Sequence, residues 1–175
     1  VTAIIWLFIF SPSFGIMNYL LEQVGLPGPA WFSDPKWAMP AIMILAVWQN
    51  FGYHTIIFLA GLQSIPQTLV EAAYVDGASK WQAFWRITFS LLAPTTFLVL
   101  IISVIGSFQV YQTVVLTTEG GPVGATTVIV FELYRHAFEF FNMGYAAAMA
   151  VALFLLIFSL TLLQFKFINP RVHYG

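Results

Sequence analysis

Long apolar stretches alternate with shorter polar segments along the chain, and this pattern predicts helices that cross a membrane. Three intervals contain no Asp, Glu, Lys or Arg: residues 37–70, 87–118 and 140–165. Each interval is longer than the roughly 20 residues that a helix needs to cross about 30 Å of hydrocarbon. We therefore expect complete transmembrane helices at residues 38–62, 95–116 and 143–168.

The segments between these spans contain Gly, Pro and Asn, which favour turns and loops. Residues 1–10 are apolar but too short to span, so we expect them to be the end of a helix truncated at its N-terminal side. Three loops are expected, at residues 11–37, 63–94 and 117–142, together with a tail at residues 169–175. All of these parts belong to one membrane domain.

The distribution of Lys and Arg predicts which loops face the cytoplasm, because cytoplasmic loops carry an excess of both residues. Segments 63–94 and 143–175 hold four of them: Lys80, Arg86, Lys166 and Arg171. The loops at 11–37 and 117–142 hold only Lys36 and Arg135. We therefore expect a cytoplasmic middle loop and tail, and two periplasmic loops, the first anchored at the interface by Trp31, Phe32 and Trp37.

Composition excludes several classes of protein. The chain of 175 residues is 60% hydrophobic and 7% charged, far from the values of soluble domains. Its net charge of -1 provides no basic surface for nucleic acid. It has no cysteine, so disulfides and thiolate metal sites are absent.

The middle loop has the pattern of two short helices joined at a glycine. Ser64 and Pro66 are typical helix-start residues, and a stripe of four apolar residues follows: Leu69, Val70, Ala73 and Tyr74. Gly77 suits the left-handed conformation that ends many helices. The first helix is therefore expected to stop at this glycine.

The second helix is expected to begin directly afterwards, because Ser79 and Gln82 have the spacing of a capping box. One of its faces would carry four residues: Trp81, Phe84, Trp85 and Thr88. Such an amphipathic pair could simply lie on the membrane surface. The identity of its residues points to something more specific.

The segment EAAYVDGASKWQAFWRI resembles the EAA motif of permease subunits of binding-protein-dependent ABC importers. The matching positions are Glu71, Ala72, Ala73, Asp76, Gly77, Ala78, Phe84 and Ile87. Three further segments resemble the carbohydrate-type permeases of the maltose and glycerol-3-phosphate group: FLAGLQSIP, TEGGP and FNMGYAAAMAVALFL. The family usually has Ile-Thr-Leu-Pro after the motif, whereas here Ser90 stands at the proline position, so the second helix could continue until Pro94 redirects it.

The resemblance implies an all-α, polytopic transmembrane helix bundle, the MetI-like core of an ABC importer permease. It implies an inner-membrane subunit that translocates a sugar, a polyol or glycerol phosphate. The implied partners are two ATPase subunits that bind the ATP and Mg²⁺, a second permease subunit and a periplasmic or lipid-anchored solute-binding protein. This chain has no GxxxxGK[ST] motif and no cofactor of its own is expected.

Six residues of the middle loop are expected to engage the ATPase: Glu71, Ala72, Ala73, Asp76, Gly77 and Ala78. The alanines would allow close approach, and Glu71 would pair with a basic groove residue. Gly77 would fix the bend, which Asp76 would cap or brace.

A substrate path is less clearly marked. Four residues are expected on one helical face, where small and hydroxyl side chains could meet a hydroxylated substrate: Ser103, Gly106, Ser107 and Val110. The resemblance adds Phe51, Gly52 and Thr55 to the same cavity. The alternative is that the small residues only let helices pack closely.

Other polar groups favour structural interpretations. His54 lies within a span and has no carboxylate at helical spacing, so we expect a neutral, hydrogen-bonded side chain rather than a proton relay. Four residues of the outer loop share a helical face: Glu132, Arg135, His136 and Glu139. A salt-bridged surface is expected there instead of a catalytic or metal site, with contact to the solute-binding protein as an alternative role.

Two other functional classes are compatible with a membrane helix bundle. An integral membrane enzyme, such as a lipid or polyprenyl transferase, would need an acid-base cluster near the interface. Glu71 and Asp76 come closest but have no His or metal partner nearby in sequence. A passive channel or structural subunit would show no dependence on ATP. We expect no enzymatic activity in this chain.

Overall fold

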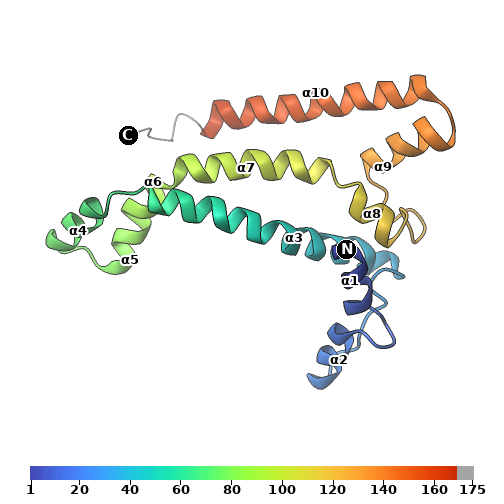
Figure 1. The fold of residues 1–175 in the computed structure, drawn as a ribbon, viewed down its shortest axis with the longest axis horizontal. Helices are drawn as coiled ribbons and strands as arrows, with labels where there is room; N and C mark the ends of the chain where they lie inside the picture. Colours follow the sequence, from blue (N-terminus) through green and yellow to red (C-terminus); the bar gives the residue numbers. More distant parts are fainter. Residues whose placement is uncertain (169–175) are drawn as a thin grey trace. The chain divides into compact units, whose positions relative to one another are not determined.

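The structure is a computed structural model that describes residues 1–168, so the predicted tail at 169–175 lies outside the described residues. Every regular element among the described residues is helical, which confirms the all-α fold class. The elements in chain order are α1 (Thr2–Ile9), α2 (Ile16–Gln23), α3 (Pro35–Gln63), α4 (Gln67–Val75), α5 (Lys80–Ala83), η1 (Phe84–Thr88), α6 (Phe89–Leu91), α7 (Ala93–Phe108), α8 (Gln112–Thr117), α9 (Ile129–Tyr134), η2 (Arg135–Glu139) and α10 (Met143–Ile168). The helices are shown in Figure 1; η1 and η2 are π-helical turns.

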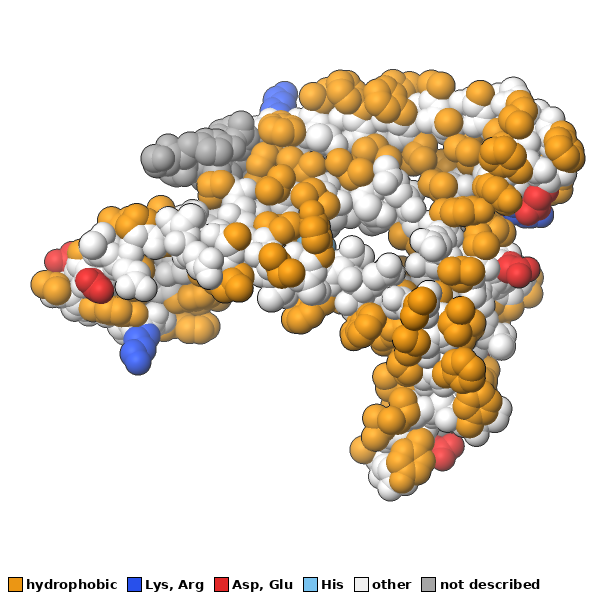
Figure 2. Space-filling view, in the orientation of Figure 1, with side chains coloured by type: hydrophobic (Ala, Val, Ile, Leu, Met, Phe, Trp, Pro, Cys, Tyr) orange, Lys and Arg blue, Asp and Glu red, His pale blue; other side chains and the backbone are white. Residues whose placement is uncertain are grey.

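Two described helices are each long and apolar enough to cross a membrane. They are α3, with 29 residues, and the Met143–Lys166 part of α10, with 24 residues. A third candidate span consists of Lys80–Leu91 and Ala93–Phe108, which are bent by 61° relative to each other. Hydrophobic side chains cover large parts of the visible surface of these helices (Figure 2), as is required where lipid is the solvent.

The chain forms two compact units. Unit 1 contains residues 1–50 and 106–154, and unit 2 contains residues 51–105 together with α10 from Leu155 onward. The division between the units falls within α3, α7 and α10. Unit 1 holds the segments predicted to be periplasmic, and unit 2 holds the middle loop.

Unit 1 is built around a cluster of aromatic rings. Phe10 stacks on Trp31 with ring centroids 4.5 Å apart, and Trp6 meets Phe10 edge-on at 4.8 Å. Trp31 is only 6% exposed, so its prediction as an interfacial anchor was wrong. Packing against Phe10 holds this indole in the core of the unit, whereas Trp37 is exposed.

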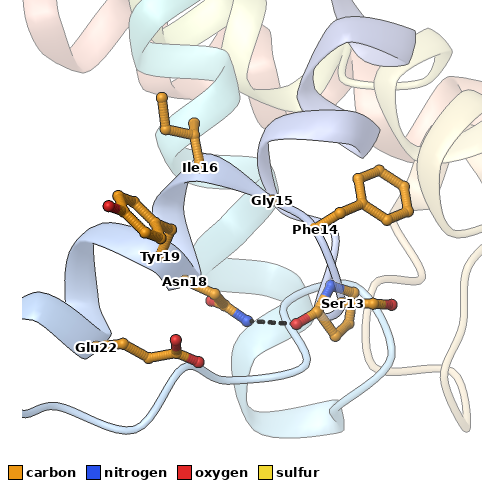
Figure 3. A pocket seen from close by; sticks show the side chains of 8 residues that line it. Ser13, Phe14, Gly15, Ile16, Asn18, Tyr19 and Glu22 are labelled. Carbon is orange, nitrogen blue, oxygen red and sulfur yellow. Dashed lines mark hydrogen bonds between the residues drawn. The ribbon is translucent and has the colours of Figure 1, made fainter.

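A buried amide holds the loop around this cluster. Trp31 Nε1 donates a 2.7 Å hydrogen bond to Asn18 Oδ1, and Asn18 Nδ2 donates to the carbonyls of Pro29 and Pro12 at 3.2 and 3.4 Å. The bond to Pro12 is drawn in Figure 3, beside a pocket of about 340 Å³ that Phe14, Tyr19 and Glu22 help to line. All of the polar atoms of Asn18 are therefore used in fixing the loop.

The N-terminus of α3 follows from the local sequence. Asp34 Oδ1 accepts a 2.8 Å hydrogen bond from the backbone N–H of Lys36. Pro35 stands at the first helical position, where its missing N–H has no helical partner. The long helix therefore begins immediately after the Trp-rich loop.

The segment predicted to be a continuous helix over 95–116 is interrupted. The helix α7 ends at Phe108, and α8 begins at Gln112. The N–H of Gln109 turns back to the carbonyl of Gly106 at 3.1 Å. The following residues, Val110 and Tyr111, pack against the buried cluster of Ile42, Val114 and Phe131 in unit 1. These packing contacts take the place of the helical hydrogen bonds that were expected to continue the span beyond Phe108.

In unit 2, α3 and α7 approach closely at Gly61. A β-carbon on Gly61 would lie 2.5 Å from Thr95 Oγ1 and 3.1 Å from Leu92 Cδ2. The same helix, α7, contacts α10 through Phe97 and Phe165, whose rings meet edge-on with centroids 5.1 Å apart. The close contact at Gly61 lies just before the middle loop leaves α3, and it therefore positions that loop.

Replacing Gly61 with alanine should destabilise the detergent-solubilised full subunit. The added methyl group must displace Thr95 or Leu92, and overpacking of this kind costs about 1–3 kcal/mol. Thermal unfolding would measure the effect, and Thr95→Ala in the same background should recover part of it.

Gly52→Ala is the matched control because a β-carbon there meets nothing within 4 Å. It lies in the same helix and should be neutral or slightly stabilising. Equal unfolding temperatures for the two alanine variants would contradict the close approach at Gly61.

Candidate functional site: a helix–turn–helix elbow

The candidate site is the segment Ser64–Leu92 of unit 2, which we call the elbow. Ser64 leaves α3 with its Oγ donating a 2.7 Å hydrogen bond to the carbonyl of Gly61. Pro66 then adopts an extended conformation, with φ -61° and ψ 123°, as the N-cap of α4. The helix α4 therefore begins at Gln67, directly after the two residues predicted to mark its start, Ser64 and Pro66.

The turn after α4 is a complete Schellman motif. The N–H of Gly77 donates to the carbonyl of Tyr74 at 3.1 Å, and the N–H of Ala78 donates to the carbonyl of Ala73 at 2.9 Å. Both bonds require a left-handed residue between the helix and its exit, and Gly77 has φ +87°. The predicted helix stop at this glycine is confirmed.

The second arm starts with the predicted capping box. Ser79 Oγ accepts a 3.3 Å bond from the N–H of Gln82, and Gln82 Oε1 accepts a 2.9 Å bond from the N–H of Ser79. Local hydrogen bonds thus join the two arms, and α4 and α5 also contact each other across the turn (Figure 1).

The second arm continues without a break through α5, η1 and α6 to Leu91. Inside it, the N–H of Phe89 donates to the carbonyl of Phe84, five residues earlier, so one turn is π-helical. The helix runs past Ser90 to Leu91, which the sequence had left open, and Pro94 lies at the second position of α7, directly after the bend. No sequence signal at these positions predicted the π-helical turn.

The side chains of the motif divide into two groups. Of the six residues predicted to engage the ATPase, four are exposed: Glu71, Ala72, Asp76 and Gly77. Ala73 is 8% exposed and packs inside the elbow, and Ala78 is half-buried. The carboxylates of Glu71 and Asp76 are not paired with any described residue. The elbow therefore presents two unpartnered acidic groups beside small residues, an arrangement suited to binding a basic surface at close range.

The residues predicted for the substrate path are distributed over both units. Phe51, Gly52 and Thr55 lie in the part of α3 that belongs to unit 2, and Ser103 lies in the corresponding part of α7. Phe51 is 69% exposed, whereas the hydroxyl of Thr55 donates to the carbonyl of Phe51 at 2.8 Å. On α3, the ring of Phe51 is therefore exposed, whereas the hydroxyl of Thr55 already has a hydrogen-bond partner.

The predicted helical face on α7 is shorter than expected. Gly106 and Ser107 are exposed residues of this helix, three and four positions after Ser103. Val110 lies beyond its end and packs against the unit 1 cluster. The expectation that Val110 continues this face was wrong, because the helix stops at Phe108.

His54 is hydrogen-bonded, as predicted. Its Nε2 lies 3.4 Å from Ser103 Oγ, a contact that links α3 to α7 within unit 2. The proton arrangement of this pair depends on the tautomer of the imidazole. The contact also means that the Ser103 hydroxyl already has a partner.

The predicted salt-bridged surface is present in unit 1, in the segment that contains Glu132, Arg135, His136 and Glu139. Arg135 donates to Glu132 at 2.8 Å and to Glu139 at 3.2 Å, and these hydrogen bonds raise the pKa of Arg135 above its usual value. His136 Nε2 lies 3.9 Å from Glu132. No cluster of three His, Asp or Glu side chains suited to a metal ion occurs within residues 1–168. Charge neutralisation between neighbours accounts for the acid-base appearance of this segment.

Comparison with known proteins gives consistent results. Residues 1–174 match the family described as the binding-protein-dependent transport system inner membrane component. The chain is 39% identical, over 176 residues, to the sn-glycerol-3-phosphate transport system permease protein UgpA of Agrobacterium fabrum. It is 34% identical, over 177 residues, to the protein of the same description from Yersinia pseudotuberculosis. These matches cover 100% and 99% of this chain but only 60% and 59% of the relatives, so the chain spans about three-fifths of their length.

Solved structures show the same relationship. A bacterial ABC transporter involved in the import of the acidic polysaccharide alginate matches with a TM-score of 0.84 and 27% identity, over 97% of this chain and 59% of that one. The bacterial alginate ABC transporter in complex with an alginate pentasaccharide-bound periplasmic protein matches with a TM-score of 0.82 and 28% identity, over 93% of this chain and 57% of that one. These similarities give no support to an integral membrane enzyme.

The family match extends over nearly the whole chain, and the EAA-type segment forms a local helix–turn–helix within it. On this evidence the chain belongs to the family of inner membrane components of binding-protein-dependent transport systems.

Proposed function

We propose that this chain is the core of a permease subunit in an ATP-binding-cassette importer, and that separate ATPase subunits bind it at the elbow. The observation that carries this proposal is the elbow itself. A glycine-dependent turn presents the exposed carboxylates of Glu71 and Asp76 at the position of the family motif. An inner membrane component that binds no nucleotide needs such a surface to receive motion from one that does.

The two carboxylates define the chemistry of the expected partner. Charge-assisted hydrogen bonds to a basic groove of the ATPase would hold α4, and Ala72 would allow the backbones to approach. Gly77 fixes the angle between the arms. Ala73 and Ala78 contribute by letting the arms pack on each other. ATP and Mg²⁺ would be bound entirely by the ATPase subunits, and this chain would carry out no catalysis.

The assembly would contain two ATPase subunits, a second permease and a periplasmic or lipid-anchored solute-binding protein. Support comes from the relatives, since one related transporter is described in complex with a periplasmic protein. The subunit would cross the inner membrane several times, with the elbow in the cytoplasm and the loops at 11–37 and 117–142 outside. Its own spans would be residues 38–62, the helix α7 (Ala93–Phe108) and residues 143–168.

The transported substrate would be a sugar, a polyol or glycerol phosphate. UgpA relatives are described as sn-glycerol-3-phosphate permeases, and the structural relatives import alginate. A hydroxylated substrate would contact the exposed ring of Phe51 and several residues with small or hydroxyl side chains: Gly52, Thr55, Ser103, Gly106 and Ser107. Aromatic rings and a few hydroxyl groups are typical of weak sites for such ligands.

Replacing Gly77 with valine should uncouple ATP hydrolysis from transport. A β-branched residue at φ +87° is strained by about 1–3 kcal/mol, so the Schellman turn should open and the arms should lose their angle. Uptake of labelled substrate and ATPase activity would be measured in proteoliposomes that contain the complete transporter. We expect uptake to fall at least ten-fold, and a factor of ten corresponds to about 1.4 kcal/mol. Membrane insertion should stay normal.

Gly77→Asn is the matched variant, because asparagine also adopts the left-handed conformation. It should keep most of the coupling. Wild-type coupling in the valine variant would refute the role of the turn.

Substitutions in the proposed substrate path should reduce uptake without affecting the elbow. Ser103→Leu removes a hydroxyl and adds bulk, and Phe51→Ala removes the exposed ring. Each should lower uptake several-fold, because a lost hydrogen bond or apolar contact costs about 1 kcal/mol. Ser159→Leu is the control, since this serine of unit 2 lies on α10 and bonds only to its own helix at Leu155. Wild-type uptake in both test variants would remove the substrate role.

A further inference from the structure

The second arm of the elbow carries a set of exposed rings, which we call the aromatic face: Trp81, Phe84, Trp85 and Phe89. The indoles of Trp81 and Trp85 meet edge-on at 5.5 Å, and Trp85 contacts Phe84 at 5.3 Å and Phe89 at 5.1 Å. Each ring contact that these residues make within the described part of the chain is with another member of the set. The four rings therefore form one continuous apolar surface.

This surface is not needed for packing the elbow. Trp81 is 71% exposed, and the other three rings are 43–45% exposed. The buried residues of the second arm and the bend are different ones, Ala83 at 1% and Leu92 at 6%. The π-helical turn, closed by the bond from the N–H of Phe89 to the carbonyl of Phe84, lies within this arm and contains two of the four rings, Phe84 and Trp85. The arm thus has an inner side that packs and an outer side that is apolar and uncovered.

Charge is divided between the two arms. The second arm, residues 80–91, contains Lys80 and Arg86 and no acidic residue. The first arm, residues 67–75, contains Glu71 and no basic residue, and Asp76 follows at its end. Basic residues beside exposed indoles are the composition of helices that lie at the surface of an anionic bilayer. The acidic arm has the opposite character and would be repelled by such a surface.

The second arm is also continuous with a membrane helix. It runs to Leu91 and meets α7 after a bend of 61°. Because α7 is an apolar helix of an inner membrane component, we expect its first residues, Ala93 and Pro94, near the boundary of the hydrocarbon. A helix that leaves this boundary at a steep angle to the span remains at the level of the headgroups.

We propose that the aromatic face binds the bilayer itself, with its rings at the boundary between headgroups and acyl chains, and that Lys80 and Arg86 face anionic headgroups. Each arm of the elbow then has its own partner. The second arm is held by lipid, and α4 is left free for a protein. The second arm then carries motion of α4 to α7 while its rings keep it at the level of the headgroups. This inference rests on membership of the inner membrane family and does not require the ATPase to grip α4.

Collision measurements with a spin label test the proposal directly. These 175 residues contain no cysteine, so Trp81→Cys and Thr68→Cys each add one labelling site to them, in a complete subunit from which any other cysteine has been removed. Thr68 is an exposed residue of α4 and serves as the matched control on the other arm. The labelled subunits would be reconstituted in vesicles of phosphatidylethanolamine and phosphatidylglycerol, and collisions with oxygen, which dissolves in lipid, would be compared with collisions with a water-soluble nickel chelate.

The ratio of oxygen to nickel collisions should be several-fold higher at position 81 than at position 68. Trp85→Cys is a second site on the aromatic face and should behave like position 81 if the Trp81 variant does not assemble. A label at both 81 and 85 that collides mainly with the nickel chelate would overturn the proposal.

The same measurement after assembly with the ATPase subunits shows whether the aromatic face contacts lipid or the ATPase. Under our proposal, the ratio at position 81 stays unchanged when the ATPase binds. If position 81 instead becomes shielded from both reagents, the aromatic face occupies a protein groove and the proposal is wrong. Failure of the ATPase to bind α4 would contradict the proposed function, yet it would leave the ratio at position 81 as predicted.

Discussion

The elbow depends on one backbone constraint, the left-handed conformation of Gly77. With φ at +87°, the N–H groups of Gly77 and Ala78 can return to the carbonyls of Tyr74 and Ala73, which ends α4 and reverses the chain. The capping box of Ser79 and Gln82 can then start the next helix at once. Because every bond in this turn is local, its geometry does not depend on the rest of the bundle. A rigid, self-contained turn is what a surface that transmits force requires.

Two joints connect this turn to the membrane helices of unit 2. On one side, the close approach of Gly61 to Thr95 and Leu92 holds the end of α3 against the start of α7. On the other side, the second arm passes through a π-helical turn into the 61° bend before α7. A displacement of α4 would therefore be delivered to α3 and α7 together. Lipid contact along the aromatic face would keep the second arm at the level of the headgroups during such a displacement.

Features that arise from local hydrogen bonding were predictable from the sequence, and features that arise from packing were not. The helix stop at Gly77 and the capping box each follow from a few adjacent residues, and the structure confirms them. The interruption at 109–111 was missed because Val110 and Tyr111 are drawn to a cluster formed by residues far away in sequence. Trp31 was misplaced for the same reason, since its stacking on Phe10 has no local signal.

We propose that the EAA-type elbow lies in the cytoplasm and is covered by a separate ATPase. A cysteine at Ala72, an exposed position, tests it with a membrane-impermeant maleimide in a complete subunit from which any other cysteine has been removed. We expect labelling in inside-out vesicles stripped of the ATPase, protection when the ATPase is restored, and no labelling of intact cells. Labelling from the outside of intact cells, or equal labelling with and without the ATPase, would contradict it.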